Sequence, residues 1–416
     1  MTFNTFFKKP TLGILVAVFV LALAGAAWVF LTKQHAPAYP ELSQIQKLWA
    51  FDEYEDYFVN LAQKKGAVYA FEVLRYAEVP STIDIHRIAH NIGYVHFEQK
   101  GLAGIYECTT DFRNACEHAI VVQALITLGT QALHDVAKVC SEGPGGLGAY
   151  VHCFHGVGHG LMAYLNYDYE NAVGTCRKVY DIAVSLRPEV TTELLWQECV
   201  GGATMELTQG EHDKDAWEKA KLTYMPATDI LMPCNVDFIP SDVRPICYAY
   251  LKPRFLEAAG ATRGVASPEA YPKALSYCKM IPEDEFGSRD GCYAGFGAAF
   301  AYFANGDART LEHMSDDAIV NVHTWCSFAD NPRGQRICDL SALDNIFWGG
   351  QSDSPASIVY CTLAPDLEIK KSCFTTLISY AQESFENKQK LDAFCGRLPS
   401  EYTDVCSIVP TPTHVP

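Results

Sequence analysis

The sequence predicts an all-α protein, built as a disulfide-stapled array of helical hairpins (a solenoid or a toroid) behind one N-terminal transmembrane helix. Three observations lead to this fold class: a long apolar run near the N-terminus, sixteen cysteines in successive pairs, and the scarcity of the alternating pattern that half-buried strands need. The chain has 416 residues, of which 49% are hydrophobic and 19% charged, a balance typical of folded globular proteins.

The N-terminal segment has the length and charge pattern of a membrane anchor. Two lysines precede an apolar run from Leu12 to Leu31, and a third lysine follows it. Twenty residues of helix span about 30 Å, the thickness of the hydrocarbon core of a bilayer. Because lysines hold their end of such a helix in the cytoplasm, we expect residues 1–10 to be cytoplasmic, residues 11–32 to span the membrane, and the main body to be periplasmic or extracellular. The alternative is a cleaved signal peptide with an Ala-x-Ala site that begins at Ala22.

The cysteines fall into eight successive pairs. Members of a pair are mostly 11 to 14 residues apart, with 8 and 23 as extremes, and the second members recur every 33 to 48 residues, the period of a helical-hairpin repeat. Zinc ribbons need ligand cysteines about two to four residues apart, so disulfides in an oxidising compartment are preferred. Pairing within each unit is favoured because it closes a short loop that a hairpin already brings together. We therefore expect Cys108–Cys116, Cys140–Cys153, Cys176–Cys199, Cys234–Cys247, Cys278–Cys292, Cys326–Cys338, Cys361–Cys373 and Cys395–Cys406.

Each cysteine pair marks one helix–loop–helix unit. A helical stretch precedes the first cysteine, as in residues 131–139, and an apolar helix follows the second, as in residues 119–126. The loop between them usually carries proline or several glycines, as at Pro144 and Pro240. The predicted order is a stiff linker over residues 33–44, histidine-rich repeats over 45–165, further cysteine-paired repeats over 166–408 and a flexible tail over 409–416.

Histidines concentrate in the N-terminal repeats, where two HxxxH pairs occur. Helical residues four apart lie on one face about 5–6 Å from each other, so both imidazoles can bind one ion. His118 and His155 each stand two positions after the second cysteine of their pair, so they occupy equivalent places in adjacent repeats. Later repeats carry other residue types there, so the fold does not require imidazole. We therefore predict one shared metal site formed by His86, His90, His118, His155 and His159.

Two carboxylates accompany these histidines. Glu117 precedes His118, and Asp84 lies two positions before His86, so either can orient an imidazole or bind the ion directly. The alternatives are a metal-free polar cleft, in which the histidines act as acid and base, and a coincidental grouping of core and surface histidines. The remaining histidines are expected at the periphery, on the surface or in loops: His35, His96, His134, His152, His212, His313, His323 and His414.

Glycines alternate at Gly156, Gly158 and Gly160, where a helix should begin. Each glycine inside a helix costs about 1 kcal/mol relative to alanine, so the alternation needs a reason. Either a ligand approaches the backbone closely or neighbouring helices do. Glycines at corresponding places in later repeats, such as Gly201 and Gly202, favour helix packing.

The histidine set predicts the type of metal and two classes of function. Nitrogen ligands favour a transition metal (zinc, copper or iron) over calcium and magnesium. Neutral imidazoles can leave a coordination position open, so the first hypothesis is metal-dependent catalysis. The second is a non-catalytic scaffold or metal-handling protein that binds a protein partner on the repeat surface.

The remaining sequence features exclude other functions but do not decide between metal-dependent catalysis and a non-catalytic role. Acidic residues outnumber basic ones by 49 to 32, which gives a net charge of −17 and argues against a nucleic-acid partner. No phosphate-binding P-loop, HExxH or GxSxG motif occurs. A histidine site inside a helical array resembles the α/α toroids of lanthionine cyclases. Their zinc is held by cysteine, which the paired cysteines here cannot supply, so no residue role is carried over.

Overall fold

The computed structural model describes residues 39–80, 83–109, 111–144, 146–188, 193–210, 212–262, 265–283, 287–306, 311, 313–349, 355–385 and 388–407. Over these ranges the chain is helical and contains no strand, which confirms the predicted all-α class. The predicted cytoplasmic segment, the anchor at 11–32 and the tail at 409–416 lie outside the described residues. One helical stretch, Asp111–Glu142, has the length and hydropathy of a membrane span, but 56% of its most apolar window is buried inside the protein, as in a core helix.

The helices follow one another with short connections. In chain order they are α2 (Leu42–Ile45), α3 (Phe51–Lys65), α4 (Ala67–Tyr76), α5 (Ile85–Lys100), η1 (Gly101–Glu107), α6 (Asp111–Leu128), η2 (Gly129–Ala132), α7 (Leu133–Glu142), α8 (Gly146–Tyr164), α9 (Tyr169–Leu186), α10 (Glu193–Gln209), α11 (Lys214–Tyr224), α12 (Arg244–Tyr250), α13 (Lys252–Ala259), η3 (Pro268–Ala270), α14 (Tyr271–Ser276), η4 (Tyr277–Met280), α15 (Ser288–Asn305), α16 (Asp316–Cys326), α17 (Pro332–Gly349), α18 (Pro355–Thr362), α19 (Leu367–Ser384), α20 (Lys388–Cys395) and α21 (Ser400–Ser407).

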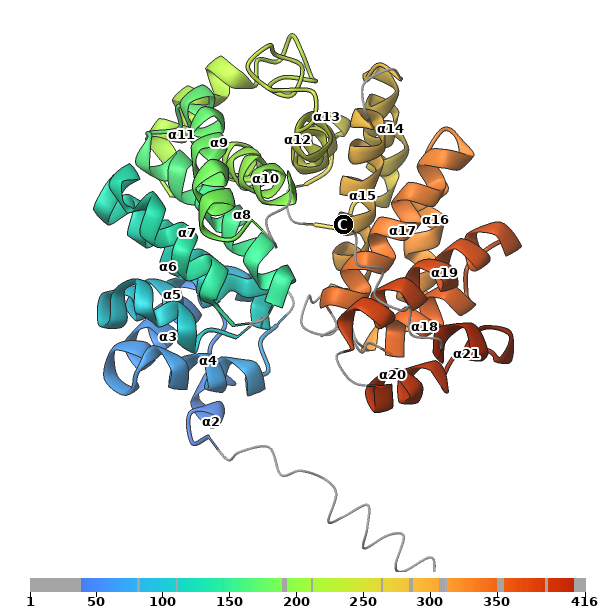
Figure 1. Cartoon of the computed structure of the whole chain (residues 1–416), viewed down its shortest axis with the longest axis horizontal. Coiled ribbons are helices and arrows are strands. Elements are labelled where there is room, and N and C mark those ends of the chain that lie inside the picture. The colour runs from blue at the N-terminus through green and yellow to red at the C-terminus, as the bar shows by residue number, and fades with distance from the viewer. Residues whose placement is uncertain are drawn as a thin grey trace, which may run out of the picture.

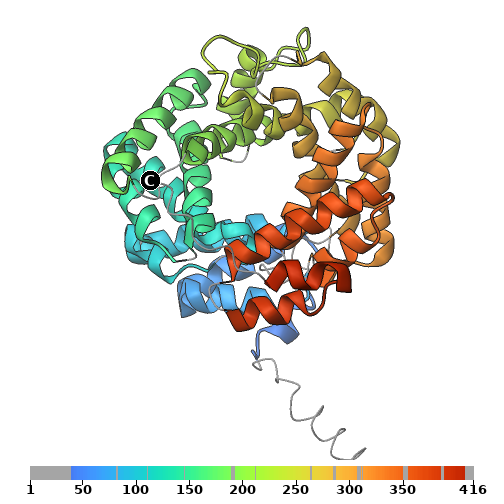
Figure 2. The same ribbon diagram turned by 45° about the vertical axis from the view of Figure 1, so that its right-hand side comes forward.

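The helices lie along a curved path in two layers (Figures 1 and 2). Helices α5, α6, α8, α10, α12, α15, α17 and α19 form one series in which each helix packs against the next. This series faces the centre of the curve in Figure 2, and helices such as α9 and α16 lie on its outer side. The series brings α5, α6, α8 and α10 together as consecutive neighbours, and these helices build the site described below.

The structure contains the eight disulfides that the cysteine spacing predicts, with Cα atoms 5.3 to 5.7 Å apart. Most of them link an outer helix to the inner helix that follows it in the chain. Cys140–Cys153 joins α7 to α8, and Cys176–Cys199 joins α9 to α10. Bridges of this kind fix the crossing of a local helix pair and leave the contact between successive inner helices to side-chain packing.

Glycines allow the inner helices to approach each other closely. A β-carbon at Gly158 would lie 2.0 Å from the carbonyl oxygen of Cys199, and one at Gly202 would lie 2.0 Å from that of His155. Real β-carbons essentially never approach another heavy atom within 3.0 Å, so α8 and α10 can pack this way only with glycine at both positions. The other two glycines of the alternating run, Gly156 and Gly160, face α6. Helix packing therefore explains this run.

The apolar core consists of two clusters that meet beside the site. One runs from Ile45 to Ile120 and fills the space between α3, α4, α5 and the start of α6. The other runs from Ile105 to Cys406 and follows the rest of the curve. Helix α6 contributes residues to both clusters, so its position is fixed from two sides. The histidines project from this well-fixed region.

Candidate metal centre

Three of the predicted histidines form a compact group on two neighbouring helices. His86 and His90 lie one turn apart on α5, with ring centroids 4.4 Å from each other. The ring of His118, on α6, lies 6.3 Å from the first and 5.9 Å from the second. Ligand nitrogens of the three side chains all lie within 4.8 Å of one another, close enough to hold one metal ion. This is the part of the predicted site that the structure brings together most tightly.

The other two predicted histidines form an adjoining pair on α8. The Nε2 atoms of His155 and His159 are 3.2 Å apart, and the His155 ring lies 5.5 Å from that of His118. The α5 pair (His86 and His90), the α8 pair (His155 and His159) and His118 line one small cavity of about 40 Å³. We expected all five imidazoles to lie around one point. The structure places three of them, His86, His90 and His118, in one group, and the other two lie beside it. The same cavity is also lined by Arg113, His152, Met205 and Tyr250.

Hydrogen bonds fix which ring nitrogen is available in the group of three. The Nδ1 atom of His86 lies 2.6 Å from the carbonyl oxygen of Phe112, and the Nε2 atom of His118 lies 2.9 Å from that of His152. A carbonyl only accepts, so these nitrogens carry the hydrogen and the opposite nitrogen of each neutral ring bears a lone pair. The Nε2 atom of His90 is buried and has no hydrogen-bond partner. A buried polar atom without a partner is costly, and a metal ion would satisfy it.

A left-handed turn places the carbonyl that orients His86. Phe112, Arg113 and Asn114 have φ angles of 54°, 60° and 59°, and regular helix follows in α6. Left-handed backbone costs a residue with a side chain roughly 1–2 kcal/mol, and such strain gathers at functional sites. The first disulfide encloses the turn. Within it, Arg113 lines the cavity and its guanidinium lies 4.6 Å from the ring centroid of Tyr302.

Two glutamates on α10 orient the pair on α8. Glu198 Oε2 lies 3.1 Å from Nδ1 of His155, and Glu206 Oε2 lies 2.8 Å from Nδ1 of His159. Such carboxylate–histidine contacts are typical of metal ligands, because they fix the ring and increase its basicity. Neither glutamate was predicted from the sequence as part of the site. The signal that was available is that they interrupt an apolar, glycine-containing helix, where an unpaired carboxylate would be unfavourable.

Glu206 is the centre of a wider buried network. Its carboxylate also contacts Nδ1 of His212 at 3.0 Å and accepts a short hydrogen bond from the hydroxyl of Tyr167. Tyr94 in turn contacts Nε2 of His212 at 3.0 Å. Burial raises the pKa of Glu206, but His212 and His159 outweigh it and hold the pKa well below its usual range. His212 lies in the loop between α10 and α11, as predicted, but the prediction that it is isolated is wrong.

The imidazoles of the site are in the form that binds metal. Burial, the largest cause, and neighbouring positive charges lower the pKa of His86, His90, His118 and His155 well below the usual range. These rings are therefore neutral at neutral pH. Metal binding then requires no removal of a proton from them.

The two carboxylates singled out in the sequence lie elsewhere. Asp84 is exposed and caps α5, accepting a hydrogen bond from the backbone N–H of Arg87 at 3.1 Å. Glu117 is buried, its Oε2 atom has no hydrogen-bond partner, and burial raises its pKa to about 8. At neutral pH Glu117 is therefore mainly protonated. Among the described residues, the carboxylates bonded to the α8 histidines are those of Glu198 and Glu206.

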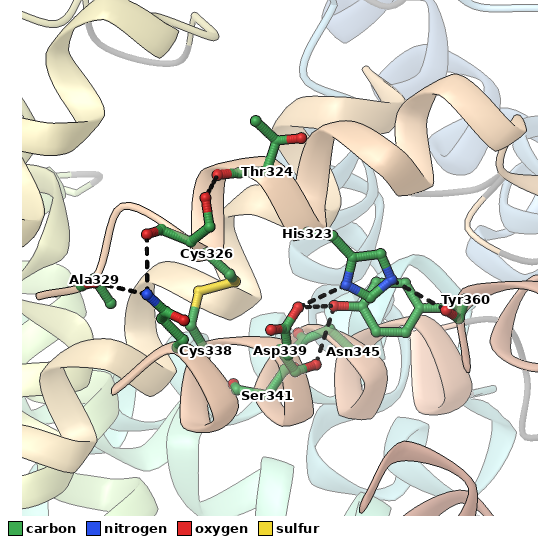
Figure 3. Close-up of a disulfide and its surroundings, with 11 residues drawn as sticks. His323, Thr324, Cys326, Ala329, Cys338, Asp339, Ser341, Asn345 and Tyr360 are labelled. Carbon is green, nitrogen blue, oxygen red and sulfur yellow. Dashed lines mark hydrogen bonds and ion pairs between the residues drawn. A yellow bond between two sulfur atoms is a disulfide. The ribbon is translucent and has the colours of Figure 1, made fainter. Parts of the chain in front are cut away.

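His323 shows how a structural histidine looks in this fold (Figure 3). Expected on the surface or in a loop, it is buried, with Nδ1 2.7 Å from Oδ1 of Asp339 and Nε2 3.0 Å from the backbone carbonyl oxygen of Tyr360. Both ring nitrogens are used, so no lone pair is left for a metal. His96 is also buried and contacts a backbone carbonyl at 3.0 Å, and it lies outside the cavity of the five histidines, as expected. The expectation for His323 was wrong because a lone histidine gives no sequence signal of burial.

Comparison of the chain with protein-family models, with curated proteins and with solved structures found no match. Function therefore has to be argued from the site itself. The donor set consists of imidazoles, and a carbonyl or a carboxylate holds one ring nitrogen in four of them: His86, His118, His155 and His159. This set fits zinc, copper or iron, because it offers borderline nitrogen ligands and no hard oxygen cage.

Proposed function

We propose that this protein binds a transition-metal ion, namely zinc, copper or iron, between His86, His90 and His118. The observation that carries the proposal is the approach of three ligand nitrogens to within 4.8 Å of one another in a buried setting. At His323, by contrast, both ring nitrogens are hydrogen-bonded. Here one nitrogen of His86 and one of His118 is hydrogen-bonded to a backbone carbonyl, so the opposite nitrogen of each neutral ring bears a lone pair.

We propose further that the bound ion supports catalysis. Three imidazoles leave coordination positions open, and an ion held this way supplies Lewis acidity and a water of lowered pKa. The chain itself provides a cavity of about 40 Å³, room for roughly three water-sized groups. Arg113 lines that cavity and offers a positive charge to an anionic or polarised oxygen. The second candidate function is that of a metal-handling protein. The small volume of the cavity favours it, because an organic substrate would not fit there.

The eight disulfide-linked segments are, in this proposal, copies of one repeating unit. Support comes from a contact that recurs between neighbouring units. In each case a glycine stands three positions after the second cysteine of its pair. It packs against the residue that stands two positions after the second cysteine of the preceding pair. This equivalence holds for Gly156 with His118, Gly202 with His155 and Gly295 with Ala249. Equivalent contacts at three junctions are what a repeat array would produce.

The proposed location of the body is outside the cytoplasm, behind a membrane helix at residues 11–32. Eight disulfides are typical of an oxidising compartment, and the lysines before the apolar run favour a cytoplasmic N-terminus. Protease added to cells with a permeabilised outer envelope should digest the body, and the cell membrane fraction should retain the full-length chain. Recovery of the full-length chain in the soluble cytoplasmic fraction would contradict this location.

Cobalt(II) tests the metal site, because its visible absorption bands report nitrogen ligation and coordination number. The full chain, purified in detergent and stripped of metal, should develop these bands on addition of Co²⁺. His90→Ala should lose a large part of the absorbance, because it removes one of the three ligands of this site. His323→Gln is the matched control, as it removes a buried imidazole outside the site, and it should keep the spectrum. Identical spectra for wild type and His90→Ala would refute the proposal.

A further inference from the structure

The geometry points to a second transition-metal ion, bound by His155 and His159 beside the ion at His86, His90 and His118, which makes the centre dinuclear. The inference rests on the proposed function for the first ion and adds a separate site to it. Four observations carry it: the spacing of two ring nitrogens, their orientation, the carboxylates behind them and the cavity that both groups share.

The spacing of the α8 pair is that of two ligands on one ion. Two imidazole nitrogens bound to a tetrahedral zinc ion, each about 2.0–2.1 Å from it, stand about 3.3 Å apart. The Nε2 atoms of His155 and His159 are 3.2 Å apart. The i,i+4 spacing on one helix face and the burial of both side chains hold this separation.

The rings of His155 and His159 are oriented so that a cation between their Nε2 atoms would be favourable. When each Nδ1–H donates to its glutamate, both Nε2 atoms bear lone pairs. Two lone pairs aimed at each other at 3.2 Å repel, and a metal ion between and in front of them removes the repulsion. The rival occupant is a proton, which would turn the contact into an ordinary Nε2–H···Nε2 hydrogen bond. The experiment below separates the two.

The carboxylates behind the pair are held more firmly than a simple hydrogen bond requires. Glu206 is fully buried, its Oε1 atom accepts a hydrogen bond from Tyr167, and its Oε2 atom contacts His212 as well as His159. Glu198 also accepts from the hydroxyl of Tyr250 at 3.5 Å, a residue that lines the cavity. A buried negative charge on this side offsets the positive charge of an added ion. Oriented carboxylates behind ligand imidazoles commonly raise metal affinity about 10- to 100-fold.

Both groups of histidines face one cavity, so two ions would be neighbours. His118 stands between them, with its ring 5.5 Å from that of His155 and 5.9 Å from that of His90. Two imidazoles do not complete a coordination sphere, so water from the cavity would occupy the remaining positions. Two ions that share a water lower its pKa together and clamp a substrate oxygen from both sides.

Zinc stoichiometry tests the inference. The metal-stripped full chain in detergent is incubated with Zn²⁺, excess metal is removed by gel filtration, and zinc per chain is measured by elemental analysis. We expect two zinc ions in wild type, one in the His155→Ala/His159→Ala double variant and one in His90→Ala. His323→Gln, the control for loss of a buried imidazole, should keep two. If the double variant does not fold, the wild-type value, taken with the stepwise heat of a Zn²⁺ titration, still decides between one ion and two.

The outcomes separate this inference from the proposed function. One zinc ion in wild type that is lost in His90→Ala but kept in the double variant overturns the second ion, assigns the α8 contact to a proton and leaves the first site intact. One ion lost in both variants means a single ion shared by all the histidines, which also overturns it. No bound zinc in wild type refutes the second ion and counts equally against the proposed function.

Discussion

A single methyl group at Gly202 should force apart the helices that carry the α8 histidines and their glutamates. The new β-carbon of Gly202→Ala would lie 2.0 Å from the carbonyl oxygen of His155, whereas such contacts essentially never fall below 3.0 Å. Helices α8 and α10 must therefore separate by about 1 Å at a contact more extensive than any other between helices of the described chain. A gap of roughly 0.5–1 Å already removes about a quarter to a half of the dispersion attraction.

The expected loss in the free energy of unfolding is about 3 kcal/mol, the upper end for overpacked cores, because the new β-carbon has no rotatable position and its partner is a backbone carbonyl. Since the shift moves His155 relative to Glu198, zinc affinity should fall by roughly 10-fold or more. Gly174→Ala is the matched control. Gly174 is exposed on α9 and a β-carbon there would meet nothing within 4 Å, so alanine should stabilise the protein by about 0.5–1 kcal/mol.

Urea unfolding with the disulfides intact measures both free energies, and a Zn²⁺ titration measures the affinity. Replacing glycine with alanine should thus lower the free energy of unfolding at Gly202 and raise it at Gly174. If Gly202→Ala unfolds within about 0.5 kcal/mol of wild type and binds zinc equally well, the close approach of α8 and α10 is not as described.

Three further outcomes follow from other parts of the structure. Cys140→Ala/Cys153→Ala opens a loop of 13 residues, and urea unfolding should show a loss of about 3 kcal/mol; an unchanged midpoint would mean that the bridge does not form. His323→Gln breaks a buried network with Asp339, so stability should fall by about 2 kcal/mol while bound zinc stays constant; a loss of zinc would mean that the metal centre extends to this helix pair. Burial raises the pKa of Asp344 from 3.8 to about 6, so the folded state holds this proton more tightly and stability is lost as pH rises from about 4 to 6. Asp344→Asn should therefore match wild type below pH 4 and exceed it by up to about 3 kcal/mol at pH 7, and an equal difference at both pH values would show that this carboxyl does not titrate as described.

The features that the sequence predicted correctly are those encoded locally. The eight disulfides follow from cysteine spacing, because partners lie at most 23 residues apart and a helical hairpin brings them together. The HxxxH pairs are equally local, since four residues of helix place two rings on one face. Their approach to His118 was inferred from the equivalence of positions after the cysteines, and helix packing in the structure agrees with it.

The parts that the sequence did not predict depend on distant pairings. Glu198 and Glu206 reach the α8 histidines from positions 43 and 47 residues later in the chain, and no local pattern connects them. Tyr94 reaches the same network through His212, which lies 118 residues later in the chain. The left-handed turn at Phe112 was equally invisible, because residues with side chains seldom adopt it and only its surroundings can stabilise it.

Anomalous diffraction from crystals of the zinc-loaded protein, collected on both sides of the zinc edge, tests the central claim most directly. The account predicts a strong anomalous peak about 2.0–2.1 Å from ring nitrogens of His86, His90 and His118, with a second peak at the same distance from Nε2 of His155 and His159. Zinc peaks confined to surface carboxylates, with none among these histidines, would contradict it.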